Sequence, residues 1–239
     1  KISSVEQAIS LVGIRPIKNF ALWSAVFSLI PNPKFGSFDL KSLWMDSLRR
    51  AVFSRSIGRA LRLSNAEELF SAALLQDMAI PVLLCAMPDV YEPLIEQRRT
   101  KQARLSSLER AEFGWDHAEA AAALCRMWQL PHDFARLIER HAQFDALLSE
   151  GTSQLDCACI AVASLLPACT DTEWREQHTF FNSLSRLTSH QSVDFTDLFK
   201  KVDSDFSEFA PLLGLPLPKK SLAIWFRDAA INSAQAAKR

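Results

Sequence analysis

Apolar residues recur every three or four positions along most of the chain, which is the spacing of one helical face. The clearest example is a single stripe formed by Leu40, Leu43, Trp44, Leu48, Val52 and Ile57. Asp39, directly before this stripe, is a favourable N-cap residue because its carboxylate accepts hydrogen bonds from free backbone N–H groups. We therefore expect a long helix that begins after Asp39 and runs to about Leu63.

The segment from Ala66 to Leu84 is apolar on nearly every side from Phe70 onward. A helix without a polar face is stable in water only when other parts of the protein surround it. The pattern predicts one continuous helix here, capped by Asn65. We expect its part from Leu69 onward to be the most buried helix of the molecule.

Capping residues and prolines divide the remaining chain into further helices. Ser3 and Glu6 have the spacing of a capping box, and so do Ser106 and Glu109. The other expected helices run from Pro16 to Pro31, Pro88 to Arg104, Asp116 to Trp128, Pro131 to Gly151 at the latest, Gln154 to Leu166, Trp174 to Thr188, Asp194 to Val202, Phe206 to Leu213 and Pro218 onward. No segment has the alternating pattern of a strand, so the sequence predicts an all-α protein.

The composition agrees with this fold and narrows the function. Six glycines and one tyrosine in 239 residues favour helix over strand. Lys+Arg and Asp+Glu both total 27, so no overall positive charge points to nucleic acid or to an anionic membrane. We find no segment that would span a bilayer and no secretion signal, so we expect a cytoplasmic protein. The five cysteines lack metal-like spacing and are expected to be small buried apolar residues.

Several short motifs occur in a particular order along the first part of the chain. They are Leu43-Trp44-x-x-Ser47, Leu74-Leu75-Gln76-Asp77, Glu109, Phe113-Gly114-Trp115-Asp116-His117-Ala118-Glu119, Trp128-x-Leu130-Pro131 and Ile138-Glu139-Arg140-His141-Ala142. Together they resemble the HDOD family, bacterial regulatory domains related to the HD and HD-GYP phosphohydrolases. The resemblance covers about residues 2 to 142.

This resemblance implies an HD-domain-like multi-helix bundle. We expect residues 1–150 to form its helical core and residues 151–239 to add C-terminal helices that pack on the same domain. The family has further helices at its N-terminus, and the first residue is Lys1. We therefore expect that these helices precede the present chain.

The resemblance also assigns five positions to a metal site. HD enzymes hold one or two divalent ions with His and Asp side chains, which suit such ions. Asp46 stands at the position of a His on the first core helix, and Gln76 replaces the His of a His-Asp doublet. Asp77 keeps the Asp of this doublet, His117 matches a later His, and His141 keeps the first residue of a His-His pair.

Two departures from this pattern predict that the enzymatic chemistry is lost. Gln76 offers only an amide oxygen, a weak and neutral ligand. Ala163 and Ser164 stand where the last carboxylate is expected. We therefore expect the helices to bring Asp46, Gln76, Asp77, His117 and His141 together in a vestigial pocket that holds no metal or other cofactor. As an alternative, all of these except Gln76 could form a single weak metal site.

The sequence thus favours a non-catalytic regulatory domain that acts through protein–protein contacts in bacterial signal transduction. Its partner would be another signalling protein, with a homodimer as a further option, and no membrane or nucleic acid is implied. Most aromatic residues of the C-terminal third belong in the core, and the rest are candidates for a partner patch. They are Trp174, Phe180, Phe181, Phe195, Phe199, Phe206, Phe209, Trp225 and Phe226.

Two alternative functions remain open at this point. The first is a metal-dependent phosphohydrolase with an altered HD site. The second is a nucleotide-binding module, in which the vestigial pocket and the helical face of Arg55, Arg59 and Arg62 receive the phosphates. Arginine runs of this kind more often form solvated surfaces, and we expect the same of Arg49, Arg50 and the basic cluster from Arg98 to Arg104.

Overall fold

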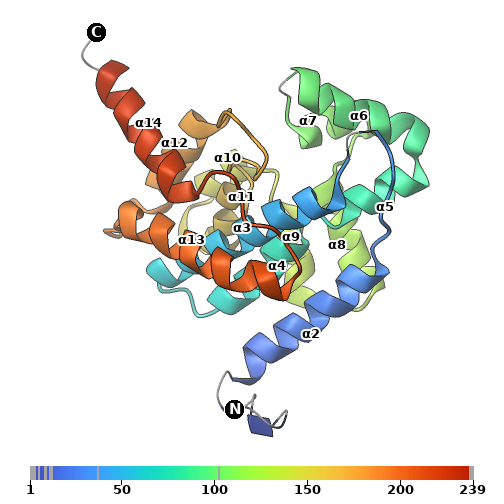
Figure 1. The fold of residues 1–239 in the computed structure, drawn as a ribbon, viewed down its shortest axis with the longest axis horizontal. Helices are drawn as coiled ribbons and strands as arrows, with labels where there is room; N and C mark the ends of the chain where they lie inside the picture. Colours follow the sequence, from blue (N-terminus) through green and yellow to red (C-terminus); the bar gives the residue numbers. More distant parts are fainter. Residues whose placement is uncertain are drawn as a thin grey trace.

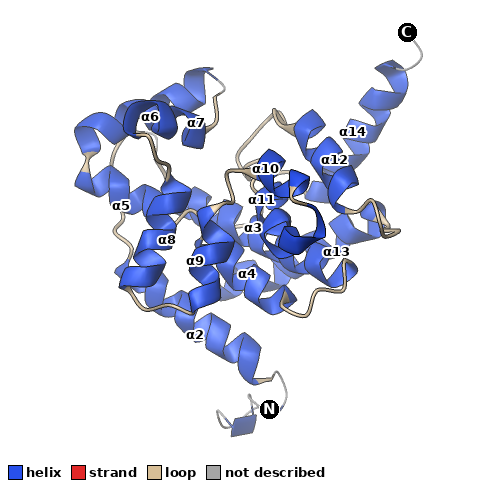
Figure 2. Cartoon of the chain, turned by 180° about the vertical axis from the view of Figure 1, so that it is seen from behind, coloured by secondary structure: helices blue, strands red, loops and turns tan. Residues whose placement is uncertain are grey.

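The computed structural model describes residues 4, 6, 7, 10, 13–36, 38–101 and 103–236. All regular elements within these ranges are helices, and they contain no strand (Figures 1 and 2). The all-α prediction is therefore confirmed. Ser3, the first residue of the predicted N-terminal capping box, lies outside the described residues.

The helices follow one another with short connections. In chain order they are α2 (Ile14–Leu29), α3 (Leu40–Ala60), α4 (Ala66–Leu75), α5 (Ala79–Ala86), α6 (Pro88–Lys101), α7 (Leu105–Phe113), α8 (His117–Met127), α9 (His132–Glu139), α10 (Phe144–Ser149), the short 3-10 helix η1 (Gly151–Gln154), α11 (Leu155–Ala163), α12 (Gln177–Leu187), α13 (Phe195–Leu212) and α14 (Leu222–Ala236). The caps of α3 and α8 are those expected from the sequence. Asp39 accepts hydrogen bonds from the N–H groups of Lys41 and Ser42, and Asp116 accepts them from Ala118 and Glu119.

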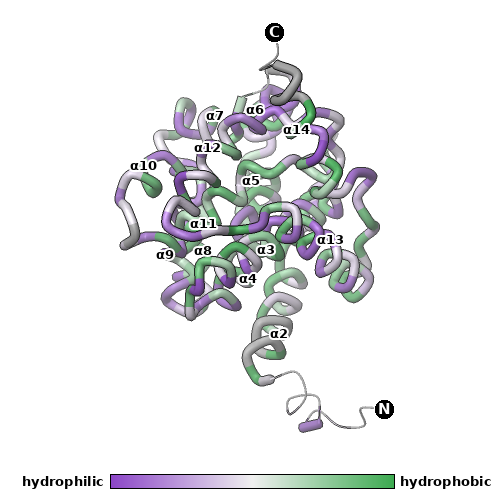
Figure 3. The backbone as a smooth tube through the Cα atoms, turned by 90° about the vertical axis from the view of Figure 1, so that its left-hand side faces the viewer, coloured by the Kyte–Doolittle hydropathy of each residue, from purple (hydrophilic) through white to green (hydrophobic). Residues whose placement is uncertain are grey.

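Helices α3 and α11 lie at the centre of the molecule. All residues of α11 from Cys157 to Ala163 are buried, and so is nearly every residue of α3 from Trp44 to Gly58. The core cluster around them extends from Trp23 in α2 to Trp225 in α14, so parts of the chain before and after residue 150 share one core. In Figure 3 hydrophobic positions run through the interior around α3, α4 and α5.

The cysteines belong largely to this interior. Cys125, Cys157, Cys159 and Cys169 are buried, as expected, whereas Cys85 is exposed. The apolar stretch Ala66–Ala86 has the length and hydropathy of a membrane span, but it is mostly buried inside the molecule. It is therefore core of a helical domain.

The prediction of one helix from Ala66 to Leu84 is wrong, because α4 and α5 are separate helices with a turn at Gln76, Asp77 and Met78. Pro81 explains the interruption. In a continuous helix its ring would clash with the carbonyl of Asp77, four residues earlier, and its missing N–H would leave that carbonyl without a donor. The chain instead closes short turns, from Met78 N–H to Leu75 and from Ile80 N–H to Asp77.

Other boundaries also differ from the prediction. The segment after Pro131 forms two helices, α9 and α10, and the turn between them holds His141. The two helices expected between Asp194 and Leu213 are one, α13, because the polar residues in its middle have tertiary partners. Asp203 accepts hydrogen bonds from the first N–H groups of α14, and Asp205 pairs with Arg55.

Two predicted caps are not formed as expected. Arg104, and not Ser106, is the N-cap residue of α7, and the Glu109 carboxylate points into the interior. Asn65 stands at the N-cap of α4 without a capping hydrogen bond, because its amide donates to Asp156 of α11 at 3.1 Å. Glu109 and Asn65 instead contact residues of other helices, which the spacing of neighbouring residues in the sequence does not reveal.

The nine C-terminal aromatic side chains, some of which were candidates for a partner patch, are all buried or half-buried. Six of their rings, those of Trp174, Phe180, Phe181, Phe199, Trp225 and Phe226, contact one another around α12, α13 and α14. Phe199 contacts Phe226 with ring centroids 4.9 Å apart, and Phe180 lies 4.8 Å from Trp174. These rings therefore form core.

A smaller hydrophobic cluster holds α5, α6 and α7 together, and it is formed by Ile80, Leu84, Tyr91, Leu94 and Leu105. We call residues 79–113 the outer lobe. Figure 1 shows α6 and α7 standing on one side of the molecule, away from α12 and α14. The candidate site lies where this lobe meets the central helices.

Candidate functional site

Three buried side chains converge at the inner edge of the outer lobe. Asp77 comes from the turn between α4 and α5, His117 is the first residue of α8, and His141 lies in the turn between α9 and α10. The two imidazole Nε2 atoms are 3.2 Å apart. Asp77 Oδ1 lies 3.5 Å from Nε2 of His117 and 3.4 Å from Nε2 of His141.

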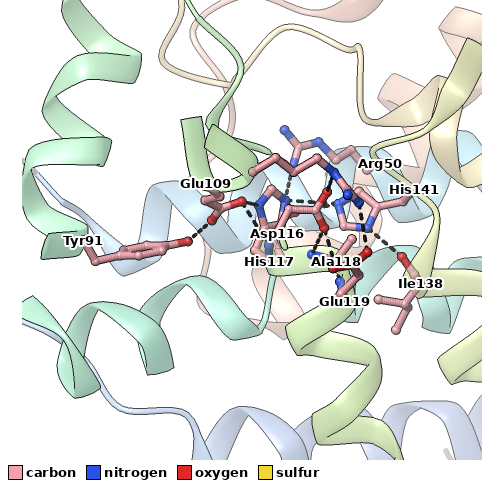
Figure 4. Close-up of polar contacts among 11 residues, drawn as sticks. Arg50, Tyr91, Glu109, Asp116, His117, Ala118, Glu119, Ile138 and His141 are labelled. Atoms are coloured by element: carbon pink, nitrogen blue, oxygen red, sulfur yellow. Dashed lines mark hydrogen bonds and ion pairs between the residues drawn. The ribbon is translucent and has the colours of Figure 1, made fainter. Parts of the chain in front are cut away.

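The other ring nitrogen of each histidine has a hydrogen-bond acceptor. His117 Nδ1 is 2.6 Å from Oε2 of Glu109, and His141 Nδ1 is 2.8 Å from the carbonyl oxygen of Ile138 (Figure 4). Because these oxygens accept, both Nδ1 atoms carry protons and both Nε2 atoms face the centre. Two lone pairs 3.2 Å apart would repel each other. A proton or a metal ion must therefore lie between them.

Glu109 is the buried anchor of His117. Its carboxylate also accepts a hydrogen bond from the backbone N–H of His117 at 3.0 Å and one from the Tyr91 hydroxyl. Burial alone would lower the pKa of His117, but the charge of Glu109 and the hydrogen bonds to Asp77 and Glu109 outweigh it and raise this pKa to about 9. The raised pKa favours the imidazolium form of His117, whose Nε2–H faces Asp77 and His141.

Arg50 of α3 is the second cation of the site. Its guanidinium forms a buried ion pair with Oδ2 of Asp77. Burial would raise the pKa of Asp77, but Arg50 and the two histidines hold it well below its usual value. The charges are thus matched in pairs, Arg50 with Asp77 and His117 with Glu109.

Asp46 and Gln76 line the same region. A cavity of about 80 Å³ is bordered by all five positions assigned from the sequence, Asp46, Gln76, Asp77, His117 and His141. Asp46 Oδ1 accepts a hydrogen bond from the backbone N–H of Cys169 at 2.6 Å, so this carboxylate holds the segment after α11. Burial raises the pKa of Asp46. Gln76 is fully buried, and neither its amide oxygen nor its amide nitrogen has a hydrogen-bond partner among the described residues.

The structure corrects the expected surface role of three arginines. Arg49 is buried and donates to the carbonyl oxygens of Pro167 and Lys220, and Arg50 pairs with Asp77. Arg55 is also buried and pairs with Asp205. Each lies on a central helix that other helices cover on all sides. The remaining residue of this face with an ion pair, Arg59, is half-exposed and bonds Glu67.

Sequence reasoning did not assign Arg50 and Glu109 to the site, although Glu109 was among the motifs that carry the family resemblance. A signal for Arg50 was present, because it follows Asp46 by four positions and therefore lies on the same face of α3 as that candidate. Glu109 was interpreted as part of a capping box. Its real partners, Tyr91 and His117, lie on two other helices.

The donor atoms fit one metal ion by distance alone. Bonds of about 2.1 Å place the ligand atoms of a tetrahedral site about 3.4 Å apart, close to the three separations within Asp77, His117 and His141. A second ion does not fit. Gln76 is neutral and Asp46 is bound to a backbone N–H. The acidic residue of α11, Asp156, pairs with Arg136 away from the site.

Comparisons with known proteins identify the family of this chain. A model of the HDOD domain family matches residues 1–144. The chain belongs to the HDOD family. No curated protein matches it significantly.

Solved structures share the fold of this HDOD chain. An HDOD protein of unknown function from Geobacter sulfurreducens is 19% identical with a TM-score of 0.64, and the match covers 87% of this chain and 72% of that one. A "putative phosphohydrolase" from Shewanella amazonensis SB2B is 18% identical with a TM-score of 0.64, covering 85% and 73%. The MmoQ response regulator from Methylococcus capsulatus is 26% identical with a TM-score of 0.51, covering 84% and 76%.

Proposed function

We propose that this HDOD domain is a non-catalytic regulatory domain of bacterial signal transduction, which acts in the cytoplasm through contact with another signalling protein. The ion pair between Arg50 and Asp77 carries this proposal. It gives the only carboxylate of the Asp–His–His cluster a cation that belongs to the protein itself. A divalent ion would have to share that carboxylate with a buried guanidinium, and the two cations would repel each other.

The rest of the site supports the same function. A metal hydrolase needs an ion with fixed ligands and one open position for water. Here a protonated His117 adds a second cation beside Asp77, and Gln76 contributes no charge. The buried network is therefore complete as a hydrogen-bonded connection between α3, α8 and the outer lobe. One similar structure is that of a response regulator, which suits a role in signalling.

Metal content and hydrolysis test this proposal together. Protein incubated with Mn²⁺ or Zn²⁺ and then dialysed should contain no stoichiometric metal by elemental analysis. It should also leave a chromogenic phosphodiester and a chromogenic phosphomonoester intact in the presence of either ion. One tightly bound ion per chain, with turnover that Asp77→Ala abolishes, would overturn the proposal.

A metal-dependent phosphohydrolase with one ion is the second candidate function. The observation that favours it is the orientation of His117 and His141, whose Nδ1–H groups are held by a carboxylate and a backbone carbonyl, as is usual for metal-binding histidines. In that case Asp77, His117 and His141 would hold the ion, which would supply hydroxide for attack on phosphorus. A control variant, Gln76→His, separates the two functions. It should leave the metal content near zero if Arg50 excludes the ion, and it should tighten the binding of an ion that the three-residue site already holds.

A further inference from the structure

A larger cavity opens beside the Asp–His–His cluster. Its volume is about 330 Å³, within the range of small-molecule sites. It lies between α3, the outer lobe and the segment from Ser164 to Glu176, and it borders the small cavity through shared residues such as Asp46, Arg50 and Arg104. We call it the lobe cavity.

Five arginines line the lobe cavity: Arg50, Arg98, Arg99, Arg104 and Arg175. Three of them have acidic partners, since Arg50 pairs with Asp77, Arg99 with Glu96 and Arg104 with Glu176. Arg98 and Arg175 form no side-chain hydrogen bond or ion pair with any described residue. The cavity therefore has two exposed guanidinium groups whose charge no residue of the described part of the chain compensates by direct contact.

The acidic residues of the lobe cavity have local partners. Asp39 caps α3, Asp46 accepts from the N–H of Cys169, and Asp171 accepts from the N–H of Ala168 at 2.8 Å. Glu176 is taken by Arg104. These four carboxylates therefore already have hydrogen-bond or ion-pair partners, whereas Arg98 and Arg175 can pair with an anionic ligand.

A second observation that points to a ligand is made in the small cavity beside the lobe cavity. Gln76 is fully buried, and neither amide atom has a partner within the described ranges, although burying an unpaired amide is unfavourable. Its side chain borders the small cavity, which shares lining residues such as Arg98 and Arg104 with the lobe cavity. A polar molecule that reaches this point would satisfy the amide.

The walls of the lobe cavity are apolar between these polar ends. They include Phe38, Leu43, Ile80, Ile95 and Leu105. A ligand that matches both surfaces has an apolar or ring-shaped body and an anionic group with several oxygens. A phosphoryl group fits the anionic end, because it carries about two charges and offers oxygens in several directions to planar guanidinium groups.

We propose that the lobe cavity binds a small phosphorylated organic molecule, whose phosphoryl group contacts Arg98 and Arg175, as the input signal of this regulatory domain. The proposal rests on the non-catalytic function proposed above. Arg98 belongs to α6 of the outer lobe, whereas Arg175 precedes α12 on the opposite side. A ligand held by both would connect the lobe to the rest of the domain, so its binding would change how the two sides are held together.

Calorimetric titration and thermal unfolding with three pairs of compounds test the proposal. The phosphorylated probes are phenyl phosphate, glucose 6-phosphate and AMP, and their counterparts are phenol, glucose and adenosine, all at equal ionic strength. We expect at least one phosphorylated probe to bind with one site per chain and its counterpart to bind far more weakly. Arg98→Ala and Arg175→Ala should each weaken binding about tenfold.

Arg227→Ala is the matched control, because Arg227 is an exposed arginine on α14 outside the cavity. This variant should bind like the wild type. No binding of any phosphorylated probe at millimolar concentration would overturn the inference. Equal binding to the double variant Arg98→Ala/Arg175→Ala would also overturn it.

Recovery of the probe distinguishes this inference from the proposed function. A bound phosphorylated probe that is recovered intact in the presence of Mn²⁺ supports both. A probe that binds and is recovered hydrolysed supports the site and overturns the non-catalytic function. Absence of binding together with absence of hydrolysis overturns the site alone.

Discussion

Gln76 and Asp77 are adjacent in the chain, but their side chains have opposite surroundings. Asp77 contacts Arg50, His117 and His141, whereas Gln76 has no polar partner in the part of the chain that the structure describes. A buried carboxylate is tolerated because several groups share its charge, and a buried amide without partners marks a place where a ligand or water is needed. Two adjacent residues of the same turn therefore give the site two different properties, a compensated charge at Asp77 and an unpaired amide at Gln76.

Removing the charge of Arg50 should destabilise the protein strongly. In Arg50→Met, Asp77 keeps a buried charge without its cation, and we expect a loss of about 3–5 kcal/mol in the free energy of unfolding. Urea denaturation measures this loss. Arg227→Met, at an exposed position, should change stability by less than about 0.5 kcal/mol.

A second variant tests the cause of that loss. Adding Asp77→Asn to Arg50→Met removes the unpaired charge, so the double variant should recover part of the stability. If Arg50→Met alone costs less than about 1 kcal/mol, the ion pair does not hold the site together, and its role in excluding a metal ion is contradicted.

At the scale of the elements, the three residues of the cluster all lie at helix ends or turns. Asp77 occupies the break between α4 and α5, His117 begins α8, and His141 follows α9. A turn can aim a side chain across the helices, while a position in the middle of a helix is restricted to one face. The Asp–His–His cluster is thus formed at helix ends and turns, whereas Arg50 and Glu109 contact it from the middle of α3 and α7.

The N-cap of α8 should be essential for placing His117. Asp116 is fully buried, accepts from the N–H groups of Ala118 and Glu119, and pairs with Arg110. Asp116→Ala should lower the free energy of unfolding by about 1–2 kcal/mol, as measured by urea denaturation. Asp116→Asn keeps a capping oxygen and should lose less. Equal losses in the two variants would show that the charge toward Arg110 matters and the cap does not.

For the whole molecule, the central feature is one core shared by distant parts of the chain. Helix α3 packs against α11 and α13, and Phe53 of α3 stacks near Phe199 of α13 with ring centroids 6.1 Å apart. The residues that the family model covers therefore rely on helices beyond it. The outer lobe has its own small cluster and borders both cavities, so it is the part of the fold best placed to respond to a ligand.

A fragment of residues 1–150 should not fold alone. Without α11 and α13 it would expose apolar faces of α3 and α4 that are fully buried in the whole chain. Circular dichroism and amide NMR spectra should show a loosely packed or aggregated fragment, whereas the full chain unfolds in one cooperative transition. A fragment with dispersed amide signals and its own sharp thermal transition would contradict this expectation.

The sequence by itself determined the helical class, the caps at Asp39 and Asp116, and the family. These features depend on local signals, namely the spacing of apolar residues and hydrogen bonds over a few positions, or on motifs that the chain retains. It also indicated which five positions would surround the pocket, because the resemblance carries the spacing of the core helices.

Only the tertiary structure showed which charged groups of the site pair with one another. Arg50 pairs with the carboxylate of Asp77, 27 positions away. Glu109, which the sequence placed in a capping box, instead contacts His117. A buried arginine and an exposed one look alike in a sequence, since burial depends on which helices cover the residue. The turn at Asp77 likewise has two causes. Pro81 prevents a continuous helix, and the surrounding helices hold the turn in place. Charge balance in the interior is a property of neighbours in space, so it could be known only from the fold.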